Sequence, residues 1–347
     1  MSLLKGVDIS SLQAMEDNGA VYIDEDGQIK DALEILKNNG VNSIRLRLFN
    51  NPSQSFDRGD YCNVKNTIPI AKRIKENGMG IYLDFHYSDF WADWQKQNIP
   101  SEWCGKSLDE LCDAVYDYTF KTLRCFKDNG AWPDIVQIGN EIGRGLLWEY
   151  GTIDKPRNIV KLLNAGITAV NDASDEGYES PKIMIHIECG AEKEQTENYF
   201  LKLNKYGIKH YDYIGLSYYP YWAGPYEKFI ENANNAYKIF GKQIVIAETA
   251  FPYTNKSNDD TPNVVDGELV YRTMGLEPSE NNQYDAIARI IKIAKNEDSI
   301  AGVYYWEPLW YQLKGVGAEK NKGNEWENQA LFDNNGRVLK GMKAFLI

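Results

Sequence analysis

The sequence predicts an α/β protein of the (β/α)8 TIM-barrel class, folded as a single domain over residues 1–347. Eight short apolar or alternating runs recur along the chain, and segments with a helical spacing of apolar residues separate them. Strands that alternate with helices favour βα units and a parallel sheet, and eight such strands close a barrel. No linker, low-complexity segment or domain-scale change of composition divides the chain.

Each predicted strand is a short run rich in Ile, Val, Leu or Tyr, which is typical of strands covered on both faces. The eight runs are Lys5–Ile9, Ser43–Phe49, Gly80–His86, Ile135–Glu141, Lys182–Glu188, Tyr213–Tyr219, Gln243–Thr249 and Gly302–Glu307.

The segments between these runs have the marks of helices. Ser107 and Glu110 form a capping box ahead of an apolar series that begins at Leu111. The other amphipathic segments are the one containing Ile29, Leu33 and Leu36 before Gly40, and Asn158–Asn171, Glu194–Tyr206, Glu227–Phe240 and Asn282–Asn296.

Long loops are expected after the third, seventh and eighth strands. The polar segment Asn255–Asn281 follows the seventh strand, and Tyr311–Gln329 follows the eighth. Loops of this length in a compact domain are usually functional.

The composition excludes several classes of partner. Lys plus Arg number 38 and Asp plus Glu 50, so the net charge is −12 and a polyanion such as nucleic acid is not an expected partner. No apolar run approaches the roughly 20 residues that span a bilayer, so no membrane partner is expected. The five cysteines lack CxxC spacing, which argues against a disulfide framework or a zinc site.

Two glutamates occupy matching positions in predicted strands. Glu141 closes the run IVQIGNE, and Glu248 lies near the end of QIVIAET, more than a hundred residues later. In a parallel barrel the ends of both strands face the same mouth. Either glutamate alone could equally pair with an arginine or cap a helix, but the two together favour a catalytic pair.

Further polar side chains converge on the same rim. Arg45 and Arg47 lie two residues apart and so share one strand face, and an arginine inside a barrel requires a carboxylate partner. A lone histidine in a strand is more often a hydrogen-bonded core residue than a catalyst, so we expect the histidines here to orient their neighbours. The candidates at the other strand ends are His86, Asp89, His186, Tyr218 and Tyr219.

Tryptophans gather at the same end of the predicted barrel. Eight of the nine fall at or after the C-terminal ends of predicted strands. Any one ring could instead pack loops together, but eight on one rim indicate a ligand with flat apolar faces and a polar edge, such as a sugar ring. These eight are Trp91, Trp94, Trp103, Trp148, Trp222, Trp306, Trp310 and Trp326.

Other chemistries lack their signatures. The three histidines show neither HxH nor HExxH spacing, which argues against a catalytic zinc ion. The sequence has no GxSxG elbow, no P-loop and no GxGxxG after a strand. Two carboxylates in an aromatic-lined mouth remain, and this combination suits glycoside hydrolysis.

The motifs resemble those of glycoside hydrolase family 53 of clan A, the arabinogalactan endo-β-1,4-galactanases. The Asn140-Glu141 pair indicates only the clan, whereas DFHYSDFWAD and IGLSYYPYW are more specific. The resemblance covers nearly the whole chain in order, through GVDISSL (6–12), RLRLFN (45–50), DFHYSDFWAD (84–93), VQIGNEI (136–142), GLLW (145–148), IGLSYYPYW (214–222), ETAFPYT (248–254), YYWEPLW (304–310) and WENQALFD (326–333).

The resemblance implies an endo-acting, retaining hydrolase of β-1,4-galactan and type I arabinogalactan, the side chains of pectin. Glu141 would be the general acid/base and Glu248 the nucleophile, with carboxyl groups about 5 to 5.5 Å apart. Glu248 would stay ionised beside Arg45 or Arg47 and a tyrosine hydroxyl such as that of Tyr218. Asn140 matches the residue that binds the sugar 2-hydroxyl, and the matches to subsite residues are His86, Asp89, Trp91, Trp222 and Trp306.

Three places depart from or extend the family pattern. Trp94 stands where many relatives have proline after WAD, which would reshape a subsite. Some bacterial relatives hold a structural calcium in an Asp-rich loop after the seventh strand; NKSNDDTPN has Asp259 and Asp260 without the full acidic pattern, so calcium stays open. Glu188 could be a subsite contact or a surface residue.

The expected partner is the polysaccharide alone, bound by a monomer that needs no cofactor for its chemistry. The start of the sequence shows no signal peptide. Because a polymeric substrate lies outside the cell, we expect a secreted or cell-surface protein, and a cytoplasmic location stays open.

Two alternatives remain at this stage. A mannanase or glucanase of the same clan would share the barrel and both glutamates, and no single residue here derives a preference for the axial 4-hydroxyl of galactose. A non-catalytic carbohydrate-binding barrel would normally have lost one of the carboxylates, and Glu141 and Glu248 are both present.

Overall fold

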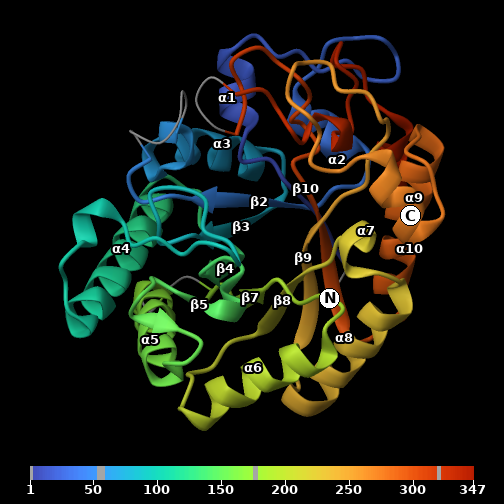
Figure 1. Ribbon diagram of the computed structural model, residues 1–347. Coiled ribbons are helices and arrows are strands. Elements are labelled where there is room, and N and C mark those ends of the chain that lie inside the picture. Colours follow the sequence, from blue (N-terminus) through green and yellow to red (C-terminus); the bar gives the residue numbers. More distant parts are fainter. Residues whose placement is uncertain (1–2, 53–58, 175–178, 319–321) are drawn as a thin grey trace.

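The computed structural model describes residues 3–52, 59–174, 179–318 and 322–347, and it contains a closed barrel of eight parallel strands (Figure 1). The barrel order is β1-β10-β9-β8-β7-β4-β3-β2. The predicted (β/α)8 fold is therefore confirmed. The strands are β1 Leu4–Asp8, β2 Ser43–Leu48, β3 Gly80–Phe85, β4 Ile135–Ile138, β7 Lys182–Ile187, β8 Tyr213–Ser217, β9 Gln243–Thr249 and β10 Ile300–Trp306.

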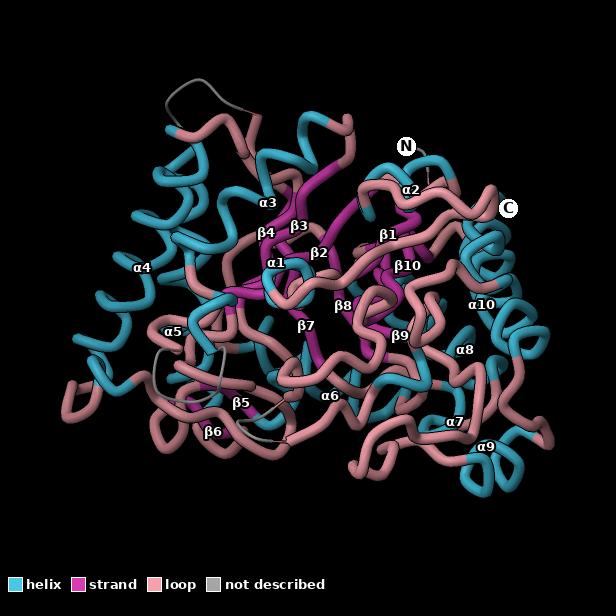
Figure 2. The backbone as a smooth tube through the Cα atoms, turned by 90° about the horizontal axis from the view of Figure 1, so that it is seen from above, coloured by secondary structure: helices cyan, strands magenta, loops and turns pink. Residues whose placement is uncertain are grey.

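Helices surround the barrel, as the view from above makes plain (Figure 2). The capping box predicted at the start of α4 is present: the Ser107 side chain accepts from Glu110 N, and the Glu110 carboxylate accepts from Ser107 N. The helices are α1 Leu12–Asp17, α2 Ala32–Asn38, α3 Val64–Glu76, α4 Leu108–Asp128, α5 Pro156–Ser174, α6 Lys193–Lys205, α7 Pro220–Ala223, α8 Tyr226–Phe240, α9 Gly267–Met274 and α10 Glu280–Asn296.

Several element boundaries differ from the sequence prediction. Helix α2 begins at Ala32 because Asp31 caps it, and Ile29 lies outside the helix and is 68% exposed. The segment Asn255–Asn281, expected to be a loop throughout, contains α9 and the start of α10. A small antiparallel pair, β5 Gly145–Leu146 and β6 Gly151–Thr152, follows β4. The expected loop Tyr311–Gln329 includes residues 319–321, which lie outside the described residues.

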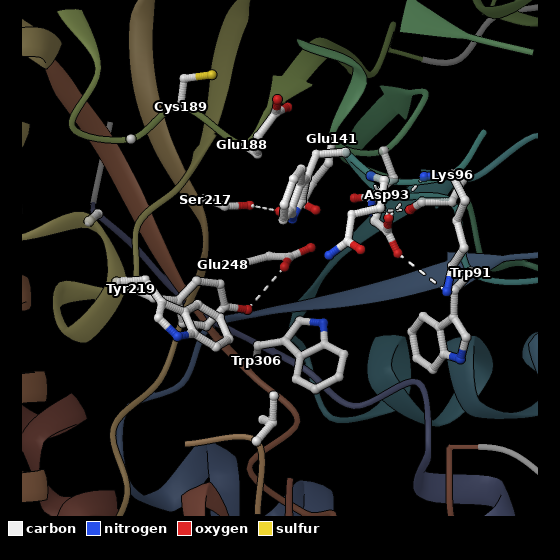
Figure 3. Close-up of a pocket in the computed structure, with 18 of the residues that line it drawn as sticks. Trp91, Asp93, Lys96, Glu141, Glu188, Cys189, Ser217, Tyr219, Glu248 and Trp306 are labelled. Carbon is white, nitrogen blue, oxygen red and sulfur yellow. Dashed lines mark hydrogen bonds and ion pairs between the residues drawn. The ribbon is translucent and has the colours of Figure 1, made fainter. Parts of the chain in front are cut away.

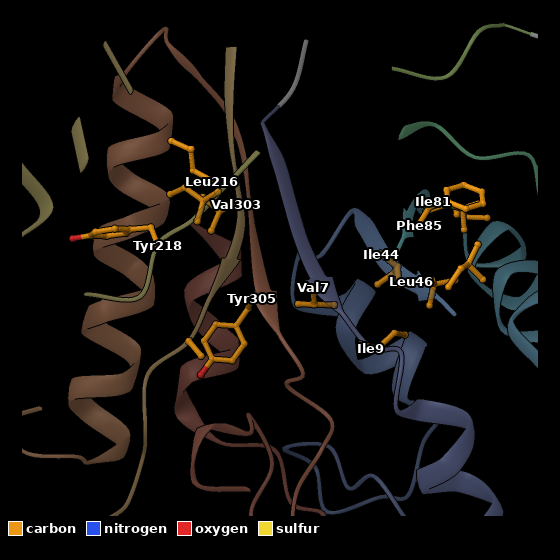
Figure 4. Packing of buried hydrophobic residues seen from close by; sticks show 14 of the residues in the cluster. Val7, Ile9, Ile44, Leu46, Ile81, Phe85, Leu216, Tyr218, Val303 and Tyr305 are labelled. Carbon is orange, nitrogen blue, oxygen red and sulfur yellow. The ribbon is translucent and has the colours of Figure 1, made fainter. Parts of the chain in front are cut away.

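Two apolar clusters stabilise the barrel. The larger one fills the layer between strands and helices, where outward-facing side chains such as Ile44, Leu216 and Val303 are fully or almost fully buried (Figure 4). The smaller one fills the N-terminal half of the interior and contains Tyr82 and Tyr304, whose rings meet edge to face. Above it the interior turns polar and charged, and this charged layer supports the functional site.

Gly6 in β1 makes room for this interior cluster. A Cβ built on Gly6 would lie 2.2 Å from the ring of Tyr304. The absence of a side chain at Gly6 therefore leaves room for the Tyr304 ring against β1. Within the described ranges, no helix has both the length and the apolar character needed to cross a membrane.

Candidate functional site

A pocket of about 720 Å³ opens at the C-terminal ends of the barrel strands. Glu141 and Glu248 both line it, so the structure brings the two predicted carboxylates together (Figure 3). Six of the eight predicted rim tryptophans also line it: Trp91, Trp94, Trp222, Trp306, Trp310 and Trp326. Trp103 instead packs against Tyr87 and Tyr118, and the backbone N–H of Trp148 donates to Gln97 O.

A turn, rather than the strand itself, delivers Glu141 to the pocket. Strand β4 ends at Ile138, three residues before the predicted end, and Gly139 and Glu141 have positive φ angles of 82° and 47°. In a straight strand Asn140 and Glu141 would point to opposite faces. The turn instead lets both side chains line the pocket.

Ser217, at the end of β8, holds the Glu141 carboxyl group. Its hydroxyl donates to Glu141 Oε1 over 2.6 Å (Figure 3). His186 Nε2 lies 2.9 Å from the same hydroxyl, and His186 Nδ1 lies 2.9 Å from Asn140 Oδ1. His186 is completely buried and lies outside the pocket lining, so the prediction that it contacts the substrate needs correction. Its hydrogen bonds suit the orienting role also considered for the histidines.

A register shift brings Glu248 into the pocket. Strand β9 pairs Leu216 with Ile246 but Ser217 with Glu248, so one extra residue, Ala247, is accommodated between them. Ala247 belongs to the interior cluster, and the bulge turns the next residue, Glu248, into the pocket.

Two donors hold the Glu248 carboxylate. Arg45 Nη1 donates to Oε1 over 2.8 Å, and the Tyr219 hydroxyl donates to Oε2 over 3.0 Å (Figure 3). Both donors favour the charged form of the carboxylate.

The two carboxyl groups therefore differ in their electrostatics. Burial raises the pKa of Glu141 well above its usual range, and the nearby Glu248 raises it further. The Ser217 hydroxyl, which donates to Glu141, acts on this pKa in the opposite direction. Burial also raises the pKa of Glu248, but Arg45 and Tyr219 act against that rise. The pair is thus arranged so that Glu248 loses its proton before Glu141.

Arg45 joins several side chains of the charged layer by hydrogen bonds. Besides Glu248, its guanidinium donates to Asp8 Oδ2 over 3.0 Å and to Asp84 Oδ2 and Asn140 Oδ1 over 2.8 Å each. Burial alone would raise the pKa of Asp84, but Arg45 and His86 outweigh burial and lower it. Arg45 therefore fixes several site residues at once.

Arg47 contacts the tryptophans of the pocket instead of Glu248. It pairs with the completely buried Glu307, and its guanidinium lies 4.1 Å from the ring centre of Trp91 and 5.8 Å from that of Trp306. The two indoles are 6.0 Å apart, so Arg47 sets the position of both rings. The alternative left open by the sequence is thus resolved: Arg45, rather than Arg47, contacts Glu248.

Asn140 and His86 join the loop after β3 to the site. Asn140 Nδ2 donates to Ala92 O over 2.9 Å, while Asn140 Oδ1 accepts from Arg45. His86 Nδ1 accepts from Ala92 N over 3.0 Å, and its Nε2 lies 3.0 Å from Asp84 Oδ2. Both residues line the pocket beside Trp91, Trp222 and Trp306, as predicted.

Two further predicted ligand contacts, besides His186, need correction. Tyr218 points to the outer face of the barrel, where its ring stacks on Phe229 and its hydroxyl donates to Gly224 O. Strand alternation places the next residue, Tyr219, in the pocket instead. Asp89 lies outside the pocket lining and accepts from Asn51 N and from the N–H and hydroxyl of Ser101, so it organises its own loop.

Several supporting residues were missed from the sequence. The acidic residues among them could have been found from the sequence, because a charged side chain inside an apolar strand needs a partner of opposite charge. For Ser217 the signal was its position two residues before the candidate Tyr219, which places both side chains on the same face. The missed residues are Asp8, Asp84, Ser217 and Glu307.

In the loop after β9, where the sequence left a calcium ion open, backbone hydrogen bonds hold Asp259. Asp259 Oδ1 accepts from Thr261 N over 2.7 Å, and Oδ2 accepts from Asn324 N over 2.9 Å. The first of these bonds lies within the loop, and the second joins it to the loop after β10. In the part of the chain that the structure describes, no three His, Cys, Asp or Glu side chains converge as metal ligands.

Comparisons with known proteins agree on one family. The family model described as glycosyl hydrolase family 53 matches residues 4–345. The arabinogalactan endo-beta-1,4-galactanase A of Aspergillus niger is 34% identical, over 90% of this chain and 87% of that protein.

Solved structures give the same result. The GH53 catalytic domain of Ignisphaera aggregans superposes with a TM-score of 0.94 at 37% identity, covering 99% of this chain and 95% of that one. A structure of fungal beta-1,4-galactanases superposes with a TM-score of 0.86 at 30% identity, covering 99% of both chains.

Proposed function

Because this chain belongs to glycosyl hydrolase family 53, we propose that it is an endo-acting, retaining galactanase that cleaves β-1,4-galactosidic bonds in galactan and type I arabinogalactan. The observation that carries the proposal is the pair Glu141 and Glu248, set in one tryptophan-lined pocket with opposite electrostatic support. In a retaining glycosidase with two carboxyl groups, one group is the general acid and the other is the nucleophile.

In the first step Glu248 is the nucleophile and Glu141 the acid. The ionised Glu248 carboxylate attacks the anomeric carbon while Glu141 gives its proton to the departing glycosidic oxygen. Arg45 and Tyr219 keep Glu248 ionised, and burial beside Glu248 keeps Glu141 protonated. The products are a galactosyl ester on Glu248 and a shortened chain with a free hydroxyl.

In the second step the roles of Glu141 reverse. Its carboxylate takes a proton from water, the water oxygen attacks the anomeric carbon, and Glu248 leaves as a carboxylate. Two displacements restore the original configuration. Asn140, whose amide group is fixed by Arg45 and Ala92, binds the sugar 2-hydroxyl, and the tryptophans stack on the sugar rings.

Three further properties are part of the proposal. The enzyme acts as a monomer on a polysaccharide, and its chemistry needs no cofactor because both proton transfer and attack are performed by carboxyl groups. A polymeric substrate places its action outside the cytoplasm, on the cell surface or in the medium.

The test is reducing-sugar release from debranched β-1,4-galactan, with β-mannan and carboxymethylcellulose in parallel. We expect the wild type to act on galactan and Glu248→Ala to be inactive. Glu141→Ala should lose about 10²- to 10⁴-fold in kcat, the range for a general acid. Glu149→Ala, at an exposed position, is the control that should retain full activity.

Each other outcome removes one part of the proposal. Activity confined to mannan or carboxymethylcellulose would refute the substrate while keeping the two glutamates. Full activity in Glu248→Ala would refute the nucleophile. Binding of galactan without cleavage by the wild type would make the protein a carbohydrate-binding barrel.

A further inference from the structure

One exposed tryptophan lies on the acid side of the pocket. Trp94 lines the pocket and is 40% exposed, whereas Trp310 and Trp326 are buried.

A tight turn fixes Trp94 in place. Asp93 and Lys96 exchange backbone hydrogen bonds of 2.8 and 3.1 Å, and the Asp93 side chain accepts from Gln95 N over 2.8 Å. Trp94 therefore stands at the tip of a turn whose two ends are joined (Figure 3 labels both ends, Asp93 and Lys96).

The same turn is tied to the segment that carries Glu141. The buried Gln97 amide donates to Asp93 O over 3.1 Å and to Asn140 O over 2.8 Å. A single side chain thus joins the backbone next to Trp94 with the backbone next to Glu141. The distance between the indole and the acid is set by hydrogen bonds rather than by loop packing alone.

Two charged side chains complete this flank. Arg144, three residues after Glu141, places its guanidinium 5.0 Å from the ring centre of Trp94. Glu188 lines the pocket (Figure 3). Its carboxylate accepts from Gly143 N over 3.0 Å. Together they offer a stacking surface, a hydrogen-bond donor and a hydrogen-bond acceptor, which are the groups that bind a sugar ring with several hydroxyls.

We propose that Trp94, Arg144 and Glu188 form a leaving-group subsite that binds a galactosyl unit on the reducing-end side of the cleaved bond. The proposal rests on the proposed function. A general acid must contact the departing oxygen, so the sugar that departs lies on the Glu141 side of the pocket. Trp94 is tied to that side, and its indole stacks on the departing ring.

The same subsite receives an acceptor sugar in the second step. An acceptor hydroxyl oxygen forms a bond to the anomeric carbon of the ester on Glu248, the bond from that carbon to Glu248 breaks, and the acceptor proton passes to the Glu141 carboxylate. Water competes for the same ester but does not need a stacking surface. The ratio of transfer to hydrolysis therefore reports on the subsite, independently of how much enzyme is active.

The experiment uses a nitrophenyl β-1,4-galactobioside as donor and galactobiose as acceptor. Nitrophenol release counts the esters formed, and chromatography counts the transfer products. We expect Trp94→Ala to lower the transfer-to-hydrolysis ratio by roughly 3- to 10-fold, the scale of one lost aromatic contact. Trp94→Phe should restore most of the ratio. Trp132→Ala, outside the pocket, should match the wild type.

The outcomes separate the subsite from the activity. A wild-type ratio in Trp94→Ala, or a wild type that releases nitrophenol but transfers nothing at any acceptor concentration, would overturn the subsite. An equal fall in Trp94→Ala and Trp132→Ala would also overturn it, because the effect would then not be local. A wild type that cleaves neither the galactobioside nor galactan would refute the proposed function instead.

Discussion

At the scale of residues, Tyr218 and Tyr219 show how one position decides a role. The two are adjacent in sequence, yet Tyr218 donates to Gly224 O on the outer face and Tyr219 donates to Glu248 Oε2 in the pocket. A hydrogen bond to a charged acceptor is worth about 1.5 to 3 kcal/mol. Tyr219 is therefore a principal support of the nucleophile.

We predict that Tyr219→Phe lowers kcat on galactan by about 10- to 100-fold, which corresponds to that hydrogen bond. The hydroxyl lowers the pKa of Glu248, so its removal raises that pKa. The nucleophile must be ionised, and the acidic limb of the kcat/KM profile should thus move to higher pH. Tyr218→Phe is the matched control, and a similar shift in both variants would contradict the assignment.

At the scale of elements, α4 depends on its capping box. Ser107 and Glu110 satisfy each other's backbone N–H groups at the start of the helix, far in sequence from either glutamate. The cap therefore acts on stability without touching the pocket.

We predict that Ser107→Ala lowers the free energy of unfolding by about 1 kcal/mol, the usual cost of losing such a cap. Urea denaturation measures this change, and kcat on galactan at 25 °C should stay at the wild-type value. Ser107→Asp keeps a good capping side chain and should retain stability. Equal losses for alanine and aspartate would mean that the cap is not the cause.

At the scale of the whole molecule, the charged layer inside the barrel couples stability to pH. Burial raises the pKa of Glu307 to about 7 from an ordinary value of 4.5, although Arg47 acts in the opposite direction. Between these values the folded protein holds a proton that the unfolded chain has lost. Its contribution to stability is complete below pH 4.5 and is lost as the pH rises to about 7.

We predict that Glu307→Gln flattens the dependence of the unfolding free energy on pH between 4.5 and 7. Urea denaturation at several pH values gives the slope, which does not depend on the constant cost of replacing the carboxyl group. Glu149→Gln, at an exposed position, should keep the wild-type slope. A wild-type slope in Glu307→Gln would show that this carboxyl group does not titrate in that range.

The barrel and the position of the two glutamates at one mouth were predictable from local patterns, because strand and helix periods are local and the strand ends of a parallel barrel share one mouth. The directions of the site side chains, in contrast, depend on contacts between parts of the chain that are distant in sequence. The positive φ at Glu141 and the register shift before Glu248 depend on neighbouring strands. The division of work between Arg45 and Arg47, and the tie from Gln97 to Asn140, depend on contacts between distant residues, which no local pattern records.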